Sequence, residues 1–247
     1  MARCEIRVGN QRVYYQVVGE GEPVILVHGL SASSRWWVRN VAALAEHYRV
    51  YLVDLPGFGM MRGFFYRFVL DNVTSWLLAW MEVVGLKEAY FVGHSMGGYI
   101  CIRVAAQRPE VVRRLILVSP AGLPGARTLP GYLVPLLQTI YYVTPSFLPI
   151  LFYDALRAGP LTFFRAARDL LSKDMQDVLE SVTVPTLLIW GENDTLVPAI
   201  FGDILRQKIA SSRLLVLKKA GHVVMYDRPE EFNAVVLAFL DGESVGK

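Results

Sequence analysis

The stretch Tyr90-Phe91-Val92-Gly93-His94-Ser95-Met96-Gly97-Gly98 decides the fold. Its first three residues form an apolar run typical of a buried strand, and Met96–Gln107 has the periodicity of a helix. The chain must therefore turn so sharply from strand to helix that the central residue, Ser95, adopts a strained backbone conformation. The flanking glycines leave room for this turn, which lifts the serine hydroxyl above the sheet edge. The pattern predicts Ser95 as a nucleophile, with the N–H of Met96 facing a developing oxyanion.

Short apolar runs, typical of strands buried on both faces of a parallel sheet, recur on either side of this turn. They are Val24–Val27, Val50–Val53, Tyr90–Val92, Leu115–Val118, Thr186–Trp190 and Leu214–Leu217. Helical periodicity fills most intervals, over Ser34–Glu46, Asp71–Val84, Met96–Gln107, Ala199–Lys208 and Pro229–Leu240. Two further β-rich runs, Glu5–Val8 and Arg12–Val18, open the chain. This alternation predicts an α/β fold with a mostly parallel, eight-stranded sheet flanked by helices.

The alternation fails once, between Pro120 and Val184, where apolar segments are punctuated by prolines and followed by helix-like sequence. We therefore expect a core domain over residues 1–121 and 182–247, and a helical insertion over residues 122–181. Within the insertion, Thr128–Tyr153 contains no charged residue and is long enough to span a membrane. Its prolines, which break helices, argue against stable membrane insertion; they are Pro130, Pro135, Pro145 and Pro149.

Composition excludes several other classes. With 247 residues, 53% hydrophobic and 19% charged, the chain is expected to fold around a sizeable core. A cluster of arginines falls near the end of a predicted helix, where cations suit the helix dipole, so the net charge of +3 does not indicate nucleic-acid binding. These arginines are Arg103, Arg108, Arg113 and Arg114.

Cysteine content and the N-terminal residues bear on compartment and cofactors. The two cysteines, Cys4 and Cys101, form no metal-binding spacing and no disulfide framework. The first seven residues carry charge where a signal peptide has an apolar run, so we expect a cytoplasmic protein. We expect neither a metal nor a cofactor.

On these motifs the chain resembles the α/β-hydrolase family over nearly its whole length, and its Gly-His-Ser-Met-Gly turn is similar to the nucleophile elbow of serine carboxylesterases. His28-Gly29 follows an apolar run, as in the family's oxyanion loop. The resemblance implies that the backbone N–H of Leu30 is the second oxyanion donor, with Ser31 as the alternative. His28 is expected to brace this loop. Asp54, in a turn that matches the family's pattern, is expected to be structural.

A serine hydroxyl is a weak nucleophile unless a base removes its proton, and the base needs a carboxylate to fix its tautomer. His222 lies just after the last strand run and matches the family's histidine loop. Asp194, in Gly191-Glu192-Asn193-Asp194, matches the family's acid, and Glu192 is the alternative. Asp227 is expected to cap or brace the final helix.

In the family, an insertion at this place forms a cap over the substrate, and the insertion of this chain is rich in apolar and aromatic residues. The predicted pocket residues are Trp37, Leu136, Ile140, Phe152, Phe164 and Val223. Together these features favour hydrolysis of uncharged carboxylic esters with short to medium acyl chains. The protein is expected to be a monomer or a homodimer.

Several other activities share this scaffold. Carbon–carbon bond hydrolases, perhydrolases and acyltransferases of the family have similar elbows, and an interfacial lipid hydrolase or a non-catalytic receptor is also compatible with the sequence. Haloalkane dehalogenases and epoxide hydrolases of the family use an aspartate as nucleophile, so Ser95 argues against both.

Overall fold

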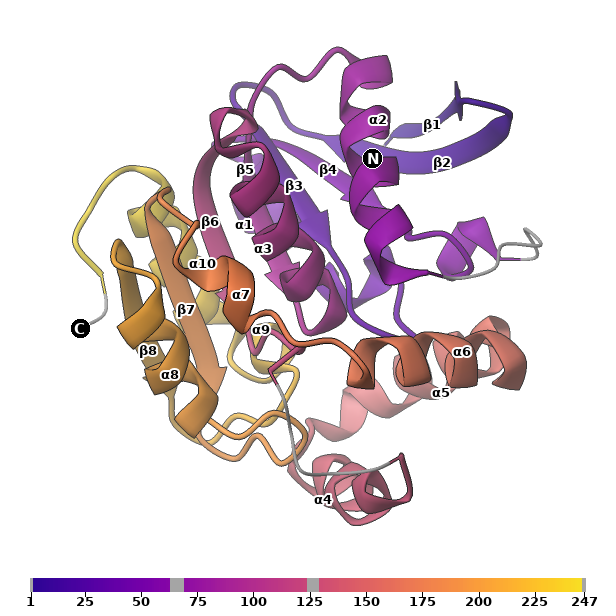
Figure 1. Cartoon of the computed structure of the whole chain (residues 1–247), viewed down its shortest axis with the longest axis vertical. Helices are drawn as coiled ribbons and strands as arrows, with labels where there is room; N and C mark the ends of the chain where they lie inside the picture. The colour runs from indigo at the N-terminus through magenta and orange to yellow at the C-terminus, as the bar shows by residue number, and fades with distance from the viewer. Residues whose placement is uncertain (1, 63–68, 124–128, 246–247) are drawn as a thin grey trace.

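The computed structural model describes residues 2–62, 69–123 and 129–245, so parts of the predicted core and insertion, at residues 63–68 and 124–128, lie outside it. Within these residues, eight strands form one sheet in the order β1-β2-β4-β3-β5-β6-β7-β8 (Figure 1). The strands are β1 (Ala2–Val8), β2 (Gln11–Val18), β3 (Pro23–Val27), β4 (Arg49–Val53), β5 (Ala89–His94), β6 (Val112–Val118), β7 (Thr186–Gly191) and β8 (Ser212–Leu217). The predicted α/β fold with an eight-stranded sheet is confirmed.

Only the first part of the sheet is antiparallel, since β1 pairs with β2 and β2 with β4 in opposite directions. From β4 onward every neighbouring pair is parallel. The strands β5 and β7 are buried along their whole length, which explains their continuous apolar sequences. Because the carboxyl ends of parallel strands meet at one edge, the loops after β3, β5, β7 and β8 lie close together.

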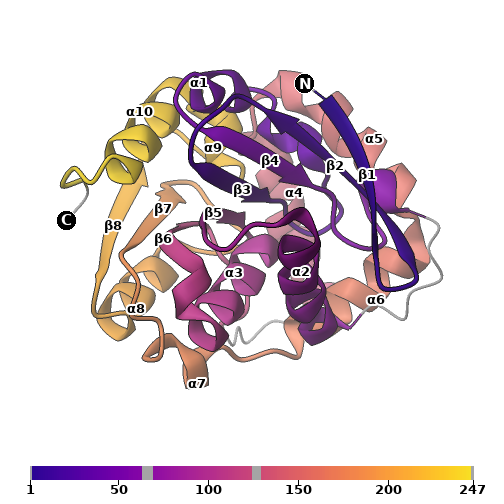
Figure 2. The same ribbon diagram turned by 90° about the horizontal axis from the view of Figure 1, so that it is seen from above.

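Helices cover both faces of the sheet, and in Figure 2 the sheet lies between two helical layers. One face packs against α2 (Leu70–Val84), α3 (Met96–Gln107) and α8 (Ile200–Lys208). The other packs against α1 (Val41–Ala45), α9 (Val224–Asp227) and α10 (Pro229–Leu240). Each layer therefore buries one apolar helix face on the sheet, as the helical periodicity predicts.

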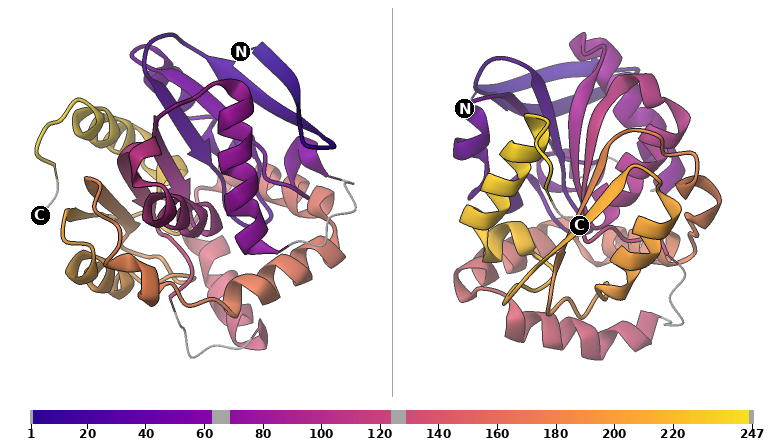
Figure 3. Two further views of the ribbon diagram at one scale, coloured as in Figure 1. Left: turned by 45° about the horizontal axis from the view of Figure 1, so that its top comes forward. Right: turned by 90° about the vertical axis from the view of Figure 1, so that its left-hand side faces the viewer.

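The segment between β6 and β7 contains the helices of the insertion that the sequence predicts over residues 122–181. They are α4 (Leu133–Tyr142), α5 (Leu148–Ala158), α6 (Pro160–Leu171) and α7 (Gln176–Leu179). Figures 1 and 3 show α4, α5 and α6 gathered at one end of the molecule, away from the two layers that flank the sheet. In the described part of the chain no single helix is long and apolar enough to cross a membrane.

One predicted helix is broken. The sequence predicts a single helix over Ser34–Glu46, whereas the structure has a 3-10 turn, Ser34–Trp37, followed by the short helix α1. The break lies at Asn40, which is fully buried and whose side-chain amide donates to the carbonyl of Met225 and to Asn233 Oδ1, both at 2.9 Å. These long-range hydrogen bonds override the local helical periodicity.

Candidate active site

Ser95 lies between β5 and α3. Its backbone has a φ of 52° and a ψ of −116°, a conformation that residues other than glycine rarely adopt. Its N–H donates to the carbonyl of Val118 at 2.9 Å, which anchors the turn to the neighbouring strand. A Cβ at Gly97 would lie only 2.3 Å from the carbonyl oxygen of Val27, so this position admits only glycine. The sharp turn predicted from the glycine pattern is present.

The structure brings His222 and Asp194 together from the loops after β8 and β7. Nδ1 of His222 lies 2.8 Å from Oδ2 of Asp194, and both residues are buried. The other carboxylate oxygen of Asp194 accepts the backbone N–H groups of Leu196 and Val197, which fixes its orientation. A carboxylate facing Nδ1 keeps the proton there and leaves Nε2 free to accept one.

Glu192, the alternative acid, is exposed and accepts the backbone N–H of Lys219 at 3.2 Å. Asp227 was expected to serve the final helix, but it accepts the N–H of Gly221 at 2.9 Å and both the N–H and the hydroxyl of Thr144. It therefore ties the loop that carries His222 to the junction between α4 and α5. A carboxylate five residues after a candidate base was the only sequence signal of this role.

His94 contacts the backbone of the loop that carries His222. Its Nε2 lies 3.0 Å from the carbonyl oxygen of His222, and because a carbonyl only accepts, Nε2 carries the proton. Burial, together with the neighbouring His222, lowers the pKa of His94 well below its ordinary value. His94 is therefore a neutral donor that positions the backbone of His222.

The loop after β3 is braced by His28. Nε2 of His28 accepts the N–H of Leu55 at 2.9 Å, so its proton is on Nδ1, 2.8 Å from the carbonyl oxygen of Gly29. Burial lowers the pKa of His28, which keeps it neutral. A Cβ at Gly29 would lie 3.1 Å from Cβ of Ser95, so the segment that continues into Leu30 passes directly beside the serine.

The sequence also predicts roles for Asp54, as a structural residue, and for Ser31, as the alternative oxyanion donor. Asp54 accepts the N–H groups of Ser34 at 2.7 Å and Met60 at 2.8 Å, which is a structural role. Ser31 has a φ of 56° and lines the cavity described below, and its buried hydroxyl has no hydrogen-bond partner among the described residues.

Ser95 and His222 open into one cavity of about 900 Å³ between the sheet edge and α4–α6. Its described lining contains no Asp, Glu, Lys or Arg. The pocket residues predicted from the sequence that line it are Leu136, Ile140, Phe152, Phe164 and Val223. The prediction that Trp37 lines the pocket is wrong. Trp37 is fully buried against Phe232 in the core, and among the described residues its neighbour Trp36 lines the cavity instead.

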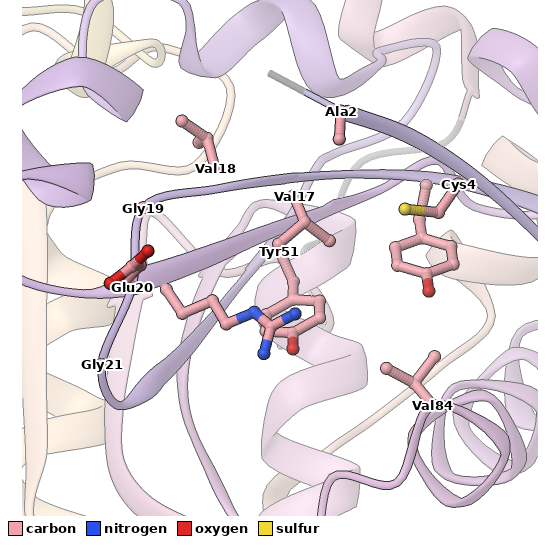
Figure 4. A pocket seen from close by; sticks show the side chains of 11 residues that line it. Ala2, Cys4, Val17, Val18, Gly19, Glu20, Gly21, Tyr51 and Val84 are labelled. Carbon is pink, nitrogen blue, oxygen red and sulfur yellow. The ribbon is translucent and has the colours of Figure 1, made fainter.

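A second hollow, of about 800 Å³, lies beside β1, β2 and the start of β4 (Figure 4). Its described lining includes Cys4, Tyr15, Glu20 and Tyr51, but no histidine that could act as a base. It faces the beginning of β4, whereas ligands of open α/β sheets bind beyond the carboxyl ends of the strands. The cavity at Ser95 is the better candidate for chemistry.

Comparison with known proteins supplies the family context. The model of the Alpha/beta hydrolase family matches residues 24–235. The chain is 30% identical to a pimeloyl-[acyl-carrier protein] methyl ester esterase of Aeromonas hydrophila, over 90% of this chain and 96% of the relative. It is 32% identical to the dihydrolipoyllysine-residue acetyltransferase component of an acetoin cleaving system of Pseudomonas putida, over 92% of this chain but only 66% of that relative.

Among solved structures, a meta-cleavage product hydrolase of Pseudomonas fluorescens superimposes with a TM-score of 0.81. It is 26% identical, and the match covers 94% of this chain and 95% of that one. The likeness thus extends through the helices between β6 and β7 as well as the sheet.

Proposed function

Because the chain belongs to the alpha/beta hydrolase family, we propose that it is a serine hydrolase that cleaves uncharged carboxylic esters with short to medium acyl chains. One observation carries the proposal. Ser95 on its strained turn and His222, which is paired with Asp194, line a single cavity whose described lining is mostly apolar. The residues of the insertion act as a cap over this cavity.

In the proposed mechanism, Nε2 of His222 removes the proton of Ser95 as the hydroxyl attacks the ester carbonyl. The N–H groups of Met96 and Leu30 stabilise the resulting oxyanion; as the first residue of α3, Met96 has no acceptor within the helix for its N–H. Protonated His222 then donates to the leaving alcohol. Water, activated by the same histidine, attacks the acyl-enzyme and regenerates Ser95.

The lining of the cavity favours an ester over substrates that carry a carboxylate. A carboxylate buried there would meet no Lys or Arg among the described lining residues, and an unpaired buried charge is costly. The esterase relative supports hydrolysis, whereas the acetyltransferase and the meta-cleavage product hydrolase keep acyl transfer and carbon–carbon cleavage as competing chemistries. All three chemistries need the same polarised carbonyl.

A series of p-nitrophenyl esters of increasing acyl length tests the proposal. We expect an optimum at short to medium chains and a loss of kcat/KM of about 10³-fold or more in Ser95→Ala. Ser181→Ala, an exposed serine before β7, is the matched control and should behave like the wild type. Full activity of Ser95→Ala would overturn the mechanism. Product ratios measured with an added thiol or alcohol separate hydrolysis from acyl transfer.

A further inference from the structure

The outer surface of α4, α5 and α6 is unusually apolar. On α4, Leu133, Leu137 and Tyr141 recur at intervals of four and are exposed by 61%, 59% and 83%. We call nine of the exposed apolar residues on these three helices the apolar roof. It consists of Leu133, Val134, Leu136, Leu137, Tyr141, Phe152, Leu156, Leu161 and Phe164. Apolar surface gathered on one element in this way marks an interaction site, unlike scattered single residues.

The apolar roof is continuous with the cavity at Ser95. Several of its members are both exposed and part of the cavity lining, so they form the rim through which a substrate enters. These shared residues are Leu133, Leu136, Phe152, Leu156 and Phe164. Whatever covers the roof therefore also lies against the entrance to the cavity.

The carboxylates of these helices are buried or paired, whereas two of their arginines are exposed. Residues 133–171 contain two carboxylates, and both are engaged: Asp154 is buried, and Asp169 accepts the N–H of Leu70 and pairs with Lys173 at 3.5 Å. The arginines of the same span include Arg165 and Arg168, which are exposed on α6. These two arginines give the apolar roof a cationic margin on its α6 side, and such a margin complements an anionic lipid surface.

We propose that the apolar roof docks on a lipid surface that carries anionic headgroups, and that Ser95 receives its ester from that surface. The segments Leu133–Tyr142 and Pro145–Ala158, which contain α4 and α5, together have the length and hydropathy of a membrane span, but they are bent by 113°. They suit a position in the plane of the interface rather than across it. The roof of a second copy is a poorer partner, because both carboxylates of residues 133–171 are already engaged and none is left to pair with Arg165 and Arg168.

Flotation with phospholipid vesicles tests the docking. Wild-type protein should float with phosphatidylcholine vesicles that contain phosphatidylglycerol. The variant Val134→Glu/Leu137→Glu changes roof residues that do not line the cavity, and it should bind at least about tenfold more weakly. The matched control, Val38→Glu/Val83→Glu, changes two valines that are exposed by 59% and 52% outside the roof, and it should float like the wild type. Both variants should hydrolyse a soluble p-nitrophenyl ester at the wild-type rate.

The cationic margin has its own test. Arg165→Gln and Arg168→Gln should each weaken binding to anionic vesicles about fivefold, with little effect on hydrolysis of the soluble ester. Equal flotation of the wild type with pure phosphatidylcholine, or wild-type flotation of Val134→Glu/Leu137→Glu, would overturn the proposal. A dimer in solution that this variant dissociates, without vesicle binding, would assign the roof to a second copy and also overturn it.

The delivery of an ester to Ser95 rests on the proposed serine chemistry, but the docking does not. Ser95→Ala should therefore float like the wild type while it loses hydrolysis. Wild-type protein that floats but hydrolyses no ester would refute the proposed function and leave the docking standing. Wild-type protein that hydrolyses soluble esters but never floats would refute the docking alone.

Discussion

At the base of the cavity, hydrogen bonds orient important polar side chains of the loops after the parallel strands: Asp194 contacts His222 and accepts two backbone N–H groups, and His28 bridges two loops. At the opposite wall, α4, α5 and α6 present apolar side chains, of which Tyr141 and Leu156 are each exposed by 83%. In the first region, specific hydrogen bonds fix the positions of the side chains. The second region is defined mainly by its shape and hydrophobicity. Substitutions should therefore abolish chemistry at the base, whereas they should shift substrate or surface preference at the roof.

The largest effects are expected at the base. His222→Ala should lower kcat by about 10⁵-fold or more, because the serine loses its base, and Asp194→Asn by about 10⁴-fold, because the wrong tautomer becomes favoured. Glu192→Gln, an exposed neighbour of Asp194, is the matched control and should remain close to the wild type. Steady-state kinetics on the preferred ester measure all three. A larger loss in Glu192→Gln than in Asp194→Asn would show that the acid is assigned wrongly.

The tight packing of the base can be tested through stability. Gly97→Ala should lower the free energy of unfolding by about 3 kcal/mol, since its Cβ would lie 2.3 Å from the Val27 carbonyl oxygen and 2.6 Å from that of His28. Gly85→Ala, at the end of α2, has a φ of +81° but no neighbour within 4 Å, so only backbone strain of about 1 kcal/mol applies. Urea unfolding compares the two. Equal losses would mean that the turn at Ser95 relaxes easily.

Parts of the base could be predicted from the sequence alone. Ser95 follows from the glycine pattern because backbone sterics leave the turn no alternative. The helices Met96–Gln107 and Pro229–Leu240 are found with the predicted bounds. The contact between Asp194 and His222 joins residues 28 positions apart and could be expected only from family resemblance, since local pattern carries no information on which loops meet.

The predictions that failed lie in the segments after β3 and β8, whereas the roof residues Leu136, Phe152 and Phe164 line the cavity as predicted. Trp36 and Trp37 are adjacent aromatic residues, and the sequence cannot say which one faces the cavity, because the answer depends on the short 3-10 turn that holds them. The break at Asn40 and the role of Asp227 depend on hydrogen bonds to distant segments. Such errors occur where tertiary contacts override local pattern.

A smaller effect is expected from filling the cavity. Ile140 on α4 lines it, so Ile140→Trp should lower kcat/KM for an octanoate ester about tenfold and leave the acetate ester nearly unchanged. Ile200→Trp on α8 is the matched control, since Ile200 is 62% exposed and outside the cavity lining. The ratio of kcat/KM for the two esters is the measurement. A parallel loss on both esters would indicate that the helix has moved and that the cavity does not select chain length.

The smallest effect concerns Asp154, where the two regions touch. This buried carboxylate on α5 accepts the hydroxyl of Ser33 at 2.7 Å, in the loop that follows Leu30, and lies 3.4 Å from Nη1 of the half-exposed Arg35. Burial raises the pKa of Asp154, against the opposing influence of Ser33 and Arg35. The folded protein therefore binds this proton more tightly than the unfolded chain does. That contribution to stability is complete below the ordinary aspartate pKa of about 3.9 and is lost as pH rises through the raised value.

Asp154→Asn keeps an oxygen that can accept from Ser33 but cannot ionise. Relative to the wild type, its free energy of unfolding should therefore rise between pH 4 and pH 7, by at most about 1 kcal/mol. Urea unfolding at the two pH values measures the change, and Asp203→Asn, on the exposed surface of α8, controls for the loss of one negative charge. A relative stability that falls with pH would mean that the ion pair with Arg35 outweighs burial. In that case an ion pair would hold α5 to the loop after β3. The roof helices would then depend on a polar contact here, as the base does, and the two regions would differ less.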